Sequence, residues 1–378
     1  MIPGLDGLRA VAYLIVFFYH VNYLKFGWVG VQLFFVLSGF LITDILLGMK
    51  ETLPIEGYFK KFYIRRILRI FPLYYFFLFL MLGISAWLIF IDYRSFLMST
   101  LQEQLPYAFI YIYNFYTAYG EHVPSPFLDH LWSLSVEEQF YLAWPLLIFL
   151  VNEKNLKKVF LAGIIAGPLF RVLFFLANDM GLSSYLQDSF PSALYVLPFT
   201  HLDAFAFGAY ISRFSISHAR RMLVLLGLFL PAAGFLSYYF ETGEMAALDS
   251  LGYLVSMPYG YQYLWAYSLI NFWFTLLIYC VVKERLFVRF LELPPLRYLG
   301  KISYGLYVYH LPMIWFSVRV RDLAGMEATP RPPLYFLAFV ATILISSISY
   351  HVLEAPLIRL KDRVAAYSRK GERHPSMR

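Results

Sequence analysis

The chain consists mainly of long apolar stretches that alternate with short polar segments. A helix needs about 20 mostly apolar residues to cross the hydrocarbon core of a bilayer, which is about 30 Å thick. About ten stretches approach this template, and they lie at residues 10–25, 29–48, 70–91, 132–151, 159–177, 193–212, 222–240, 261–282, 303–320 and 334–353. The pattern therefore predicts an all-α protein, a polytopic bundle of about ten transmembrane helices.

The segment 92–130 departs from this pattern. Its 94–115 portion is apolar enough to touch a membrane, but the polar run 102–104 and Pro106 interrupt it. A full crossing there would invert every later loop and place most positive charges outside. We therefore predict an extracytoplasmic loop that contains an interfacial or re-entrant helix.

The basic residues orient the predicted helices. Most of the 31 Lys and Arg residues fall in six places: the amino end, the segments 49–69, 152–158, 212–221 and 283–301, and the carboxyl-terminal tail. Cytoplasmic loops carry an excess of Lys and Arg, and a cytoplasmic amino terminus places all six on that side. Both termini are therefore predicted to be cytoplasmic. The remaining basic residues are Lys25, Arg94, Arg171, Arg319, Arg321 and Arg331.

Composition places the chain in a lipid bilayer. Of its 378 residues 60% are hydrophobic and 15% are charged, with a mean hydropathy of +0.61. Soluble domains are about 45–50% apolar and about 25% charged. The aromatic share of 20% is typical of the Trp and Tyr belts at membrane interfaces. A net charge of +7 would suggest nucleic acid for a soluble protein, but here the positive charges follow the loops, so we expect no nucleic-acid partner.

The remaining counts limit the domain organisation and the chemistry. Cys280 is the single cysteine, so no disulfide or CxxC motif forms within the chain, and no histidine or carboxylate pattern indicates a metal site. The apolar stretch after Arg9 lacks a signal-peptide cleavage site and is interpreted as the first helix. We expect one integral-membrane domain over residues 1–360 and a polar, basic cytoplasmic tail over 361–378.

His20 is the first candidate for chemistry. It follows Arg9 by about 11 positions in the first predicted helix, which places it about 16 Å deeper and near the bilayer middle. Ionisable groups inside a span are costly and usually functional, and imidazole titrates near neutral pH. The alternative is a structural histidine that is bonded to a neighbouring carbonyl.

Two further groups of charged residues each have two interpretations. Glu137 and Glu138 open the fourth predicted helix, where an acid can act in a site or simply complement the helix dipole and, with Ser133, cap the helix. Arg66 and Arg69 are spaced i, i+3 in a basic segment. Such a pair can bind a phosphorylated cofactor, or it can be the ordinary positive charge of a cytoplasmic loop.

Three other polar sites lie in or beside predicted spans. His201 and Asp203 lie in the sixth span, and His310 lies in the ninth, either as a polar lining or within aromatic packing. Glu354 follows the tenth span, where snorkelling or an ion pair is the default interpretation.

Seven strings along the chain, taken together, carry a resemblance to a known family. They are Leu5-Asp-Gly-Leu-Arg9-Ala, Phe18-Tyr-His20, Gly30-Val-Gln-Leu-Phe-Phe-Val-Leu-Ser-Gly-Phe-Leu-Ile42, Arg65-Arg66-Ile-Leu-Arg69-Ile-Phe-Pro72, Trp132-Ser-Leu-Ser-Val-Glu137-Glu-Gln-Phe-Tyr141, Ser303-Tyr-Gly-Leu-Tyr-Val-Tyr-His310 and Glu354-Ala-Pro356. In this order they resemble the acyltransferase-3 family of integral-membrane O-acyltransferases.

The resemblance implies ten transmembrane helices and transfer of an acyl group, commonly acetyl from acetyl-CoA, to surface glycans or lipid-linked sugars. It implies that His20 is the catalytic histidine with Arg9 supporting the site, and that Arg66 and Arg69 hold the acyl-CoA phosphates. Glu137 matches the family's acid at the membrane edge.

The chain also departs from the family pattern at two points. Many relatives carry an additional SGNH-type domain, which is not expected within the short segment 354–378. His201 stands where an arginine is expected, so the resemblance assigns it no role.

The predicted function is therefore a multi-pass O-acyltransferase of the bacterial inner membrane. It would move an acyl group, most simply acetyl, from cytoplasmic acyl-CoA to a hydroxyl of an extracytoplasmic glycan or lipid-linked sugar. The reaction needs a base whose pKa is near neutrality, which His20 would supply, and a group that stabilises an oxyanion. The alternative is a proton-coupled transporter or flippase for a lipid-linked glycan, with His20 and Glu137 as a proton relay.

Overall fold

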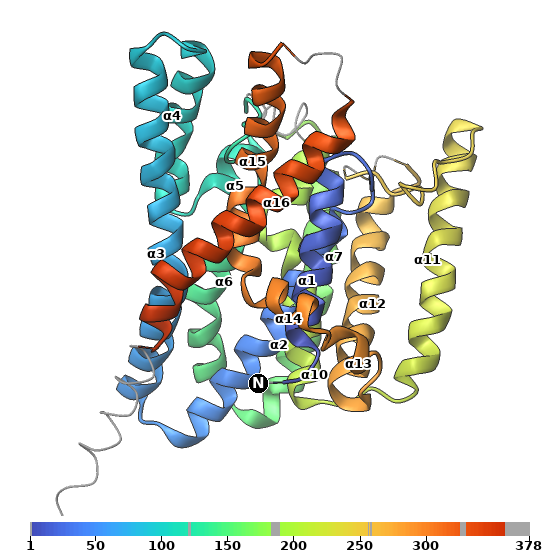
Figure 1. Cartoon of the computed structure of the whole chain (residues 1–378). Helices are drawn as coiled ribbons and strands as arrows, with labels where there is room; N and C mark the ends of the chain where they lie inside the picture. The colour runs from blue at the N-terminus through green and yellow to red at the C-terminus, as the bar shows by residue number, and fades with distance from the viewer. Residues whose placement is uncertain are drawn as a thin grey trace, which may run out of the picture. The chain divides into compact units, whose positions relative to one another are not determined.

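The computed structural model describes residues 2–119, 122–182, 190–255, 257, 259–325 and 330–359. Within these ranges every regular element is a helix (Figure 1). The described residues include six helices that are long and apolar enough to cross a membrane: Val29–Thr52, Ile55–Phe90, Glu153–Asp179, Ala219–Thr242, Gln262–Glu284 and Arg331–Arg359. The all-α class and the multi-pass character are thereby confirmed. The number of about ten spans and the sides of the termini stay predictions, and the tail at 361–378 lies outside the described residues.

The chain divides into two compact units. The first comprises Met1–Ile45 and Pro106–Ser303, and the second comprises Leu46–Leu105 and Tyr304–Arg378. The helices within the first unit are α1 (Leu5–His20), α5 (Tyr113–Ala118), α6 (Leu131–Leu150), η1 (Glu153–Asn155), α7 (Leu156–Asp179), α9 (Phe190–Val196), η2 (Pro198–His201), α10 (Leu202–Arg213), α11 (Ala219–Thr242), α12 (Gln262–Glu284), α13 (Val288–Leu291) and α14 (Pro294–Lys301). The second unit holds α3 (Ile55–Phe90), α16 (Arg331–Ser349), the π-helix η3 (Tyr350–Glu354) and nearly all of α15 (Ser303–Leu323). Helices α2 (Val29–Thr52) and α4 (Ser95–Phe109) run through the unit boundaries.

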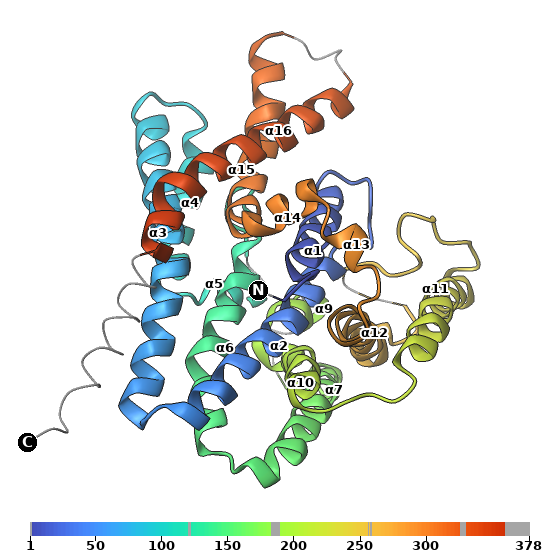
Figure 2. The same cartoon turned by 60° about the horizontal axis from the view of Figure 1, so that its bottom comes forward.

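In the first unit α10 packs against α7 and α12, and α11 packs along α12 (Figure 2). Helix α1 packs along the short helix α14, although α1 ends at His20 and α14 begins only at Pro294 (Figures 1 and 2). The amide of Gly4 donates to Glu292 Oε1 at 2.6 Å, so the start of α1 is also bound to the segment before α14. The first unit therefore joins the amino-terminal helix to residues near 300.

Helices α2 and α10 touch through a reciprocal pair of glycines. A Cβ on Gly39 would overlap the carbonyl oxygen of Phe205, and a Cβ on Gly208 would overlap that of Val36. Small residues let helix backbones approach closely in membranes, where packing rather than hydrophobic burial drives association. The contact brings the Phe35 and Phe205 rings to a centroid distance of 4.9 Å, and Phe205 also stacks on Phe140 of α6 at 4.1 Å. These two glycines thus set the spacing of the helices around this aromatic core.

Helix α1, Leu5–His20, lies closer to the amino terminus than the predicted span 10–25. Helix α1 ends at His20, because Asn22 adopts the left-handed region at φ 60° and the amide of Tyr23 turns back to the carbonyl of Phe18 at 2.9 Å. Asparagine is one of the few residues that enter this region readily. His20 is therefore the last residue of its helix and lies at a helix terminus rather than part-way along a continuous span.

The sixth predicted span, 193–212, is wrong as a continuous helix. The structure has α9, then the 3₁₀-helix η2, then α10. Pro198 begins η2, and Leu197 before it is extended at φ −79° and ψ 140°. Proline lacks an amide donor and forces the preceding residue out of the α region. Pro198 marks this break in the sequence, but the apolar character of residues 193–212 predicted a continuous span.

The basic segment 49–69 is mostly helix and not loop. Helix α3 begins at Ile55 and continues for 36 residues to Phe90, so that Arg66 and Arg69 lie on one helix with the apolar stretch that follows. Lys and Arg are good helix formers, and hydropathy therefore marks the end of the apolar stretch but not the end of the helix. The irregular segment 92–130 does contain helices, α4 and α5, as predicted; its place in the membrane stays a prediction.

The second unit packs η3 against α3. Within it Tyr304 donates from its hydroxyl to the carbonyl of Ile70 at 3.3 Å, and the Tyr309 hydroxyl contacts Ser349 Oγ at 3.3 Å. The Tyr309 ring also lies 5.9 Å from that of Phe77. Helix α15 is thus bound to α3 on one side and to the end of α16 on the other.

The glycine contact predicts a position-specific loss of stability. Gly39→Ala should lower the free energy of unfolding by about 1–3 kcal/mol, because its methyl group forces α2 and α10 apart. Thermal unfolding of the purified protein in detergent measures the change. Gly48→Ala is the matched control on the same helix, because a Cβ there meets nothing within 4 Å; it should be neutral or slightly stabilising. Equal effects of both substitutions would contradict the role of this contact.

Candidate functional site

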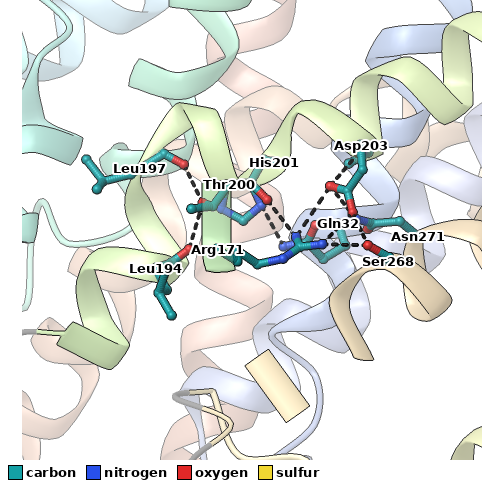
Figure 3. Close-up of polar contacts among 10 residues, drawn as sticks. Gln32, Arg171, Leu194, Leu197, Thr200, His201, Asp203, Ser268 and Asn271 are labelled. Carbon is teal, nitrogen blue, oxygen red and sulfur yellow. Dashed lines mark hydrogen bonds and ion pairs between the residues drawn. The ribbon is translucent and has the colours of Figure 1, made fainter. Parts of the chain in front are cut away.

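A buried ion pair lies within the first unit. Arg171 of α7 and Asp203 of α10 are both 0% exposed, and Arg171 Nη2 donates to Asp203 Oδ2 at 2.8 Å (Figure 3). Arg171 Nη1 also donates to the carbonyl of Thr200 at 2.7 Å. That carbonyl belongs to η2, where the predicted sixth span is broken. The guanidinium therefore binds both the carboxylate and the backbone of the broken segment.

Helix α12 completes the shell around Asp203. Ser268 Oγ donates to Asp203 Oδ2 at 2.6 Å and accepts from Arg171 Nη2 at 2.5 Å. Asn271 Nδ2 donates to Asp203 Oδ1 at 3.3 Å, and the Arg171 guanidinium lies 5.4 Å from the centre of the Tyr267 ring. A buried ion pair is tolerated only where hydrogen bonds satisfy its remaining lone pairs and protons. Ser268 and Asn271 supply part of this compensation and join α12 to α7 and α10, while Arg171 Nε is buried without a hydrogen-bond partner among the described residues.

His201 lies next to this pair in sequence and is held at both ring nitrogens. Its Nε2 contacts the carbonyl of Tyr195 at 2.7 Å, and its Nδ1 contacts Gln32 Nε2 at 3.2 Å (Figure 3). A carbonyl can only accept, so Nε2 carries the proton and Nδ1 accepts from the Gln32 amide. The ring also lies 5.8 Å from Trp132 in a stacked arrangement and 5.1 Å from Phe35. His201 is thus a neutral, fixed imidazole that joins η2 to α2.

Sequence reasoning missed this cluster as a unit. Arg171 was visible as an arginine inside the predicted span 159–177, where an ionisable group should have a partner close by. The residues His201 and Asp203 were noted, but nothing in their spacing pointed to α7 or α12. The partners are 29 to 97 residues apart in sequence, and only the helix packing brings them together.

Glu137 is bound to helix α2. Ser38 Oγ donates to Glu137 Oε1, and the Tyr141 hydroxyl donates to the same oxygen at 2.8 Å. One turn further along α6, Trp144 Nε1 donates to Thr43 Oγ1 of α2 at 2.8 Å. The acid predicted as a site residue thus faces α2, and two of the strings quoted above meet here.

His20 and Arg9 lie on the same helix but apart. Arg9 Nη1 pairs with Asp6 Oδ1 at 2.8 Å at the start of α1. His20 is partly buried at its end, and its ring lies 5.0 Å from that of Tyr19. A separation of about 11 helical residues corresponds to about 16 Å, so the two side chains are not in contact. Any support that Arg9 gives to His20 must act through other groups.

The arginines predicted to bind the phosphates of acyl-CoA lie in the second unit. Arg66 and Arg69 are partly buried and are one turn apart on α3. The Arg66 guanidinium lies 5.7 Å from the centre of the Phe62 ring, a cation–π arrangement that restricts where it can point. Two guanidinium groups on one helix face can donate charge-assisted, bidentate hydrogen bonds to phosphate oxygens.

Comparison with known proteins decides the family. A sequence model described as an acyltransferase domain, that of acyltransferase-3, matches residues 2–351. The chain belongs to the acyltransferase-3 family. The match includes His20, Glu137 and the two candidate arginines of α3, Arg66 and Arg69, so the candidate residues all lie inside the acyltransferase-3 domain.

Curated relatives agree with this assignment. The chain is 30% identical to the O-acetyltransferase OatA of Staphylococcus aureus (strain NCTC 8325 / PS 47) over 388 residues, which cover 98% of this chain and 60% of that protein. It is 28% identical to the peptidoglycan O-acetyltransferase OatA of Listeria monocytogenes serovar 1/2a over 385 residues, covering 94% and 56% of the two chains. YrhL of Bacillus subtilis (strain 168) is 30% identical over 375 residues, with 94% and 55% covered. The chain thus spans less than two thirds of the length of these relatives. No solved structure matches it significantly.

The buried ion pair predicts a large loss of stability when one charge is removed. Asp203→Asn leaves the Arg171 guanidinium buried without its counter-charge, which should lower the free energy of unfolding by about 3–5 kcal/mol. Glu284→Gln is the matched control, because it breaks an ion pair with Arg220, whose side chain is 61% exposed; such pairs contribute at most about 1 kcal/mol. Thermal unfolding in detergent compares the two, and a small effect of Asp203→Asn would contradict the structural role of the pair.

Proposed function

We propose that this chain is an O-acetyltransferase that moves an acetyl group from cytoplasmic acetyl-CoA to a hydroxyl of an extracytoplasmic glycan. The acyltransferase-3 match over residues 2–351 carries the proposal. The relatives named as O-acetyltransferases support acetyl as the transferred group, and the one named for peptidoglycan supports a cell-wall glycan as the acceptor class.

The proposed general base is His20. It ends α1 and is followed by a turn that pairs with another loop, since the amide of Phe26 donates to the carbonyl of Asp249 at 3.1 Å. A base at a helix end can be reached by a hydroxyl from the loop side, whereas one inside a packed helix face cannot. Removing the proton of the attacking hydroxyl typically contributes about 10²–10⁴-fold to the rate.

Arg66 and Arg69 are proposed to bind the phosphates of acetyl-CoA. Guanidinium groups keep their charge at every relevant pH and match phosphate oxygens with two parallel donors. Their position on α3, near its basic amino-terminal end, fits a donor that arrives from the cytoplasm. Arg9 and Glu137 are proposed to support the site. Glu137 does so by accepting hydrogen bonds from the hydroxyls of Ser38 and Tyr141, which fixes these groups between α2 and α6.

The proposal also requires about ten spans and cytoplasmic termini. The only cysteine among the described residues, Cys280, is buried, so single cysteines added at exposed positions can report sidedness. In intact cells, Glu51→Cys should resist a membrane-impermeant maleimide until the membrane is opened, whereas Val123→Cys and Glu244→Cys should react at once. The unsubstituted protein is the control and should stay unlabelled. Labelling of Glu51→Cys from outside would overturn the placement of donor and acceptor.

The catalytic proposal is tested with purified protein in nanodiscs, labelled acetyl-CoA and soluble peptidoglycan fragments. His20→Ala should lower acetyl transfer by at least about 10²-fold while acetyl-CoA still binds, because the proposed base and the proposed phosphate-binding arginines are different residues. The double variant Arg66→Ala, Arg69→Ala should instead lose donor affinity. Exposed His218→Ala and Arg289→Ala serve as controls and should keep both properties.

The same measurement separates the enzyme from a flippase for a lipid-linked glycan. A flippase with a His20 proton relay would lose glycan movement on substitution, and even its wild type would not bind acetyl-CoA. Saturable acetyl-CoA binding with release of CoA only in the presence of a glycan acceptor supports the transferase. Folded wild-type protein that binds no acetyl-CoA would exclude it.

A further inference from the structure

The turn between α1 and α2 is folded back on the helical end that carries the proposed base. The amides of Tyr23 and Leu24 both donate to the carbonyl of Phe18, at 2.9 and 3.1 Å. Gly27 lies so close to α1 that a Cβ there would overlap the carbonyl oxygen of Ile15. Closely packed groups transmit a displacement to their neighbours. A shift of this turn would therefore also shift the end of α1.

A segment of a distant loop, residues 249–255, is hydrogen-bonded to this turn. The amide of Phe26 donates to the carbonyl of Asp249 at 3.1 Å. Trp28 Nε1 donates to the carbonyl of Tyr253 at 3.3 Å. Trp28 is 1% exposed, so solvent does not compete for the second bond. The turn after the proposed base is thus joined at two points to a segment more than 220 residues further along the chain.

The segment is itself held to helices α11 and α12. Gly252 adopts the left-handed region at φ 77°, and a Cβ there would overlap the carbonyl oxygen of Gly234 on α11. The Tyr253 hydroxyl donates to the carbonyl of Leu230 on the same helix at 2.7 Å. Gln262 Nε2, at the start of α12, donates to the Gly252 carbonyl at 2.9 Å. Such contacts give a loop segment the local stability of the helices that bind it.

The indole N–H of Trp28 is the feature that ring packing does not explain. The ring lies edge-on to those of Tyr195 at 5.7 Å and Tyr267 at 5.4 Å, and a phenylalanine ring could make the same kind of contact. A buried indole N–H usually has a hydrogen-bond partner. Here the partner belongs to the 249–255 segment and not to the helices that pack the ring.

We propose that Trp28 is a positioning residue for His20, because its indole N–H ties the turn after α1 to the 249–255 segment. Through this turn, the bond keeps the end of α1 and its imidazole in the geometry that proton removal requires. Helix ends open more easily than helix interiors, and a shift of about 1 Å at a reacting group can cost about 10²-fold in rate. The inference rests on the proposed role of His20 as general base and adds a residue that acts on it through the backbone.

Two matched Trp→Phe substitutions test this with purified protein in nanodiscs. Trp28→Phe keeps an aromatic ring but removes the N–H donor. It should lower kcat for acetyl transfer to soluble peptidoglycan fragments about tenfold, while acetyl-CoA affinity by titration calorimetry changes less than about twofold. Trp273→Phe is the control, because Trp273 Nε1 donates to the carbonyl of Leu223 at 3.0 Å near the start of α11, whereas the 249–255 segment follows its end. It loses the same kind of bond, so its Tm should also fall, but kcat should stay within about twofold.

A double-mutant cycle with His20 separates positioning from a general loss of packing. In the His20→Ala background, Trp28→Phe should change the residual rate by less than about twofold, because no base is left to position. Equal losses in both backgrounds would overturn the positioning role, as would an unchanged kcat of Trp28→Phe. A tenfold loss in Trp273→Phe as well would also overturn it. Each of these results leaves the proposed function intact.

Failure of the proposed function gives a different result. A folded wild type that binds no acetyl-CoA, or a rate that survives His20→Ala, would overturn the proposed function or the proposed base together with this inference. Should Trp28→Phe not be recovered folded, Tyr253→Phe takes its place, because it loosens the 249–255 segment by removing the hydroxyl that binds the Leu230 carbonyl. The same selective loss of kcat is then expected at smaller amplitude, and an unchanged kcat would overturn the proposal.

Discussion

The buried pair of Arg171 and Asp203 is the interaction on which the first unit depends most. Two opposite charges with no exposed surface need hydrogen bonds from neighbouring polar groups, since lipid and apolar side chains offer none. The compensation comes from the carbonyl of Thr200 and from Ser268 and Asn271. Because these groups belong to η2 and α12, the pair fixes the break in the sixth predicted span as firmly as it fixes the helices. His201, one residue after Thr200, is oriented by its own contacts with the carbonyl of Tyr195 and the Gln32 amide.

The second constraint is the close approach of α2 and α10. It explains how adjacent residues of α2 contact two different helices. Successive residues of a helix point about 100° apart. Gly39 faces the backbone of α10, while Ser38 faces α6 and donates to Glu137. A larger residue at Gly39 would therefore move α2 away from α10 and would also shift the hydroxyl that binds Glu137. The segment around Ser38 and Gly39 therefore packs closely against α10 and also makes a hydrogen bond to α6.

The second unit solves a different electrostatic problem. Its long helix α3 carries basic side chains within the same helix as its apolar stretch, and the Arg66 guanidinium lies over the aromatic ring of Phe62.

The amino-acid sequence by itself determined the all-α class, most helix positions and the family, because hydropathy and the order of the strings are local properties that survive without knowledge of packing. It also marked His20, Glu137, Arg66 and Arg69, whose roles stay predictions. Hydropathy misplaced the carboxyl end of α1 and the start of α3, and it missed the break in the sixth span. At these places Asn22, the basic helix formers and Pro198 decided the structure. Only the tertiary structure decided that Arg171 meets Asp203 and that Gly39 meets Phe205. These partners are tens to hundreds of residues apart, and their meeting depends on helix packing that no local pattern encodes.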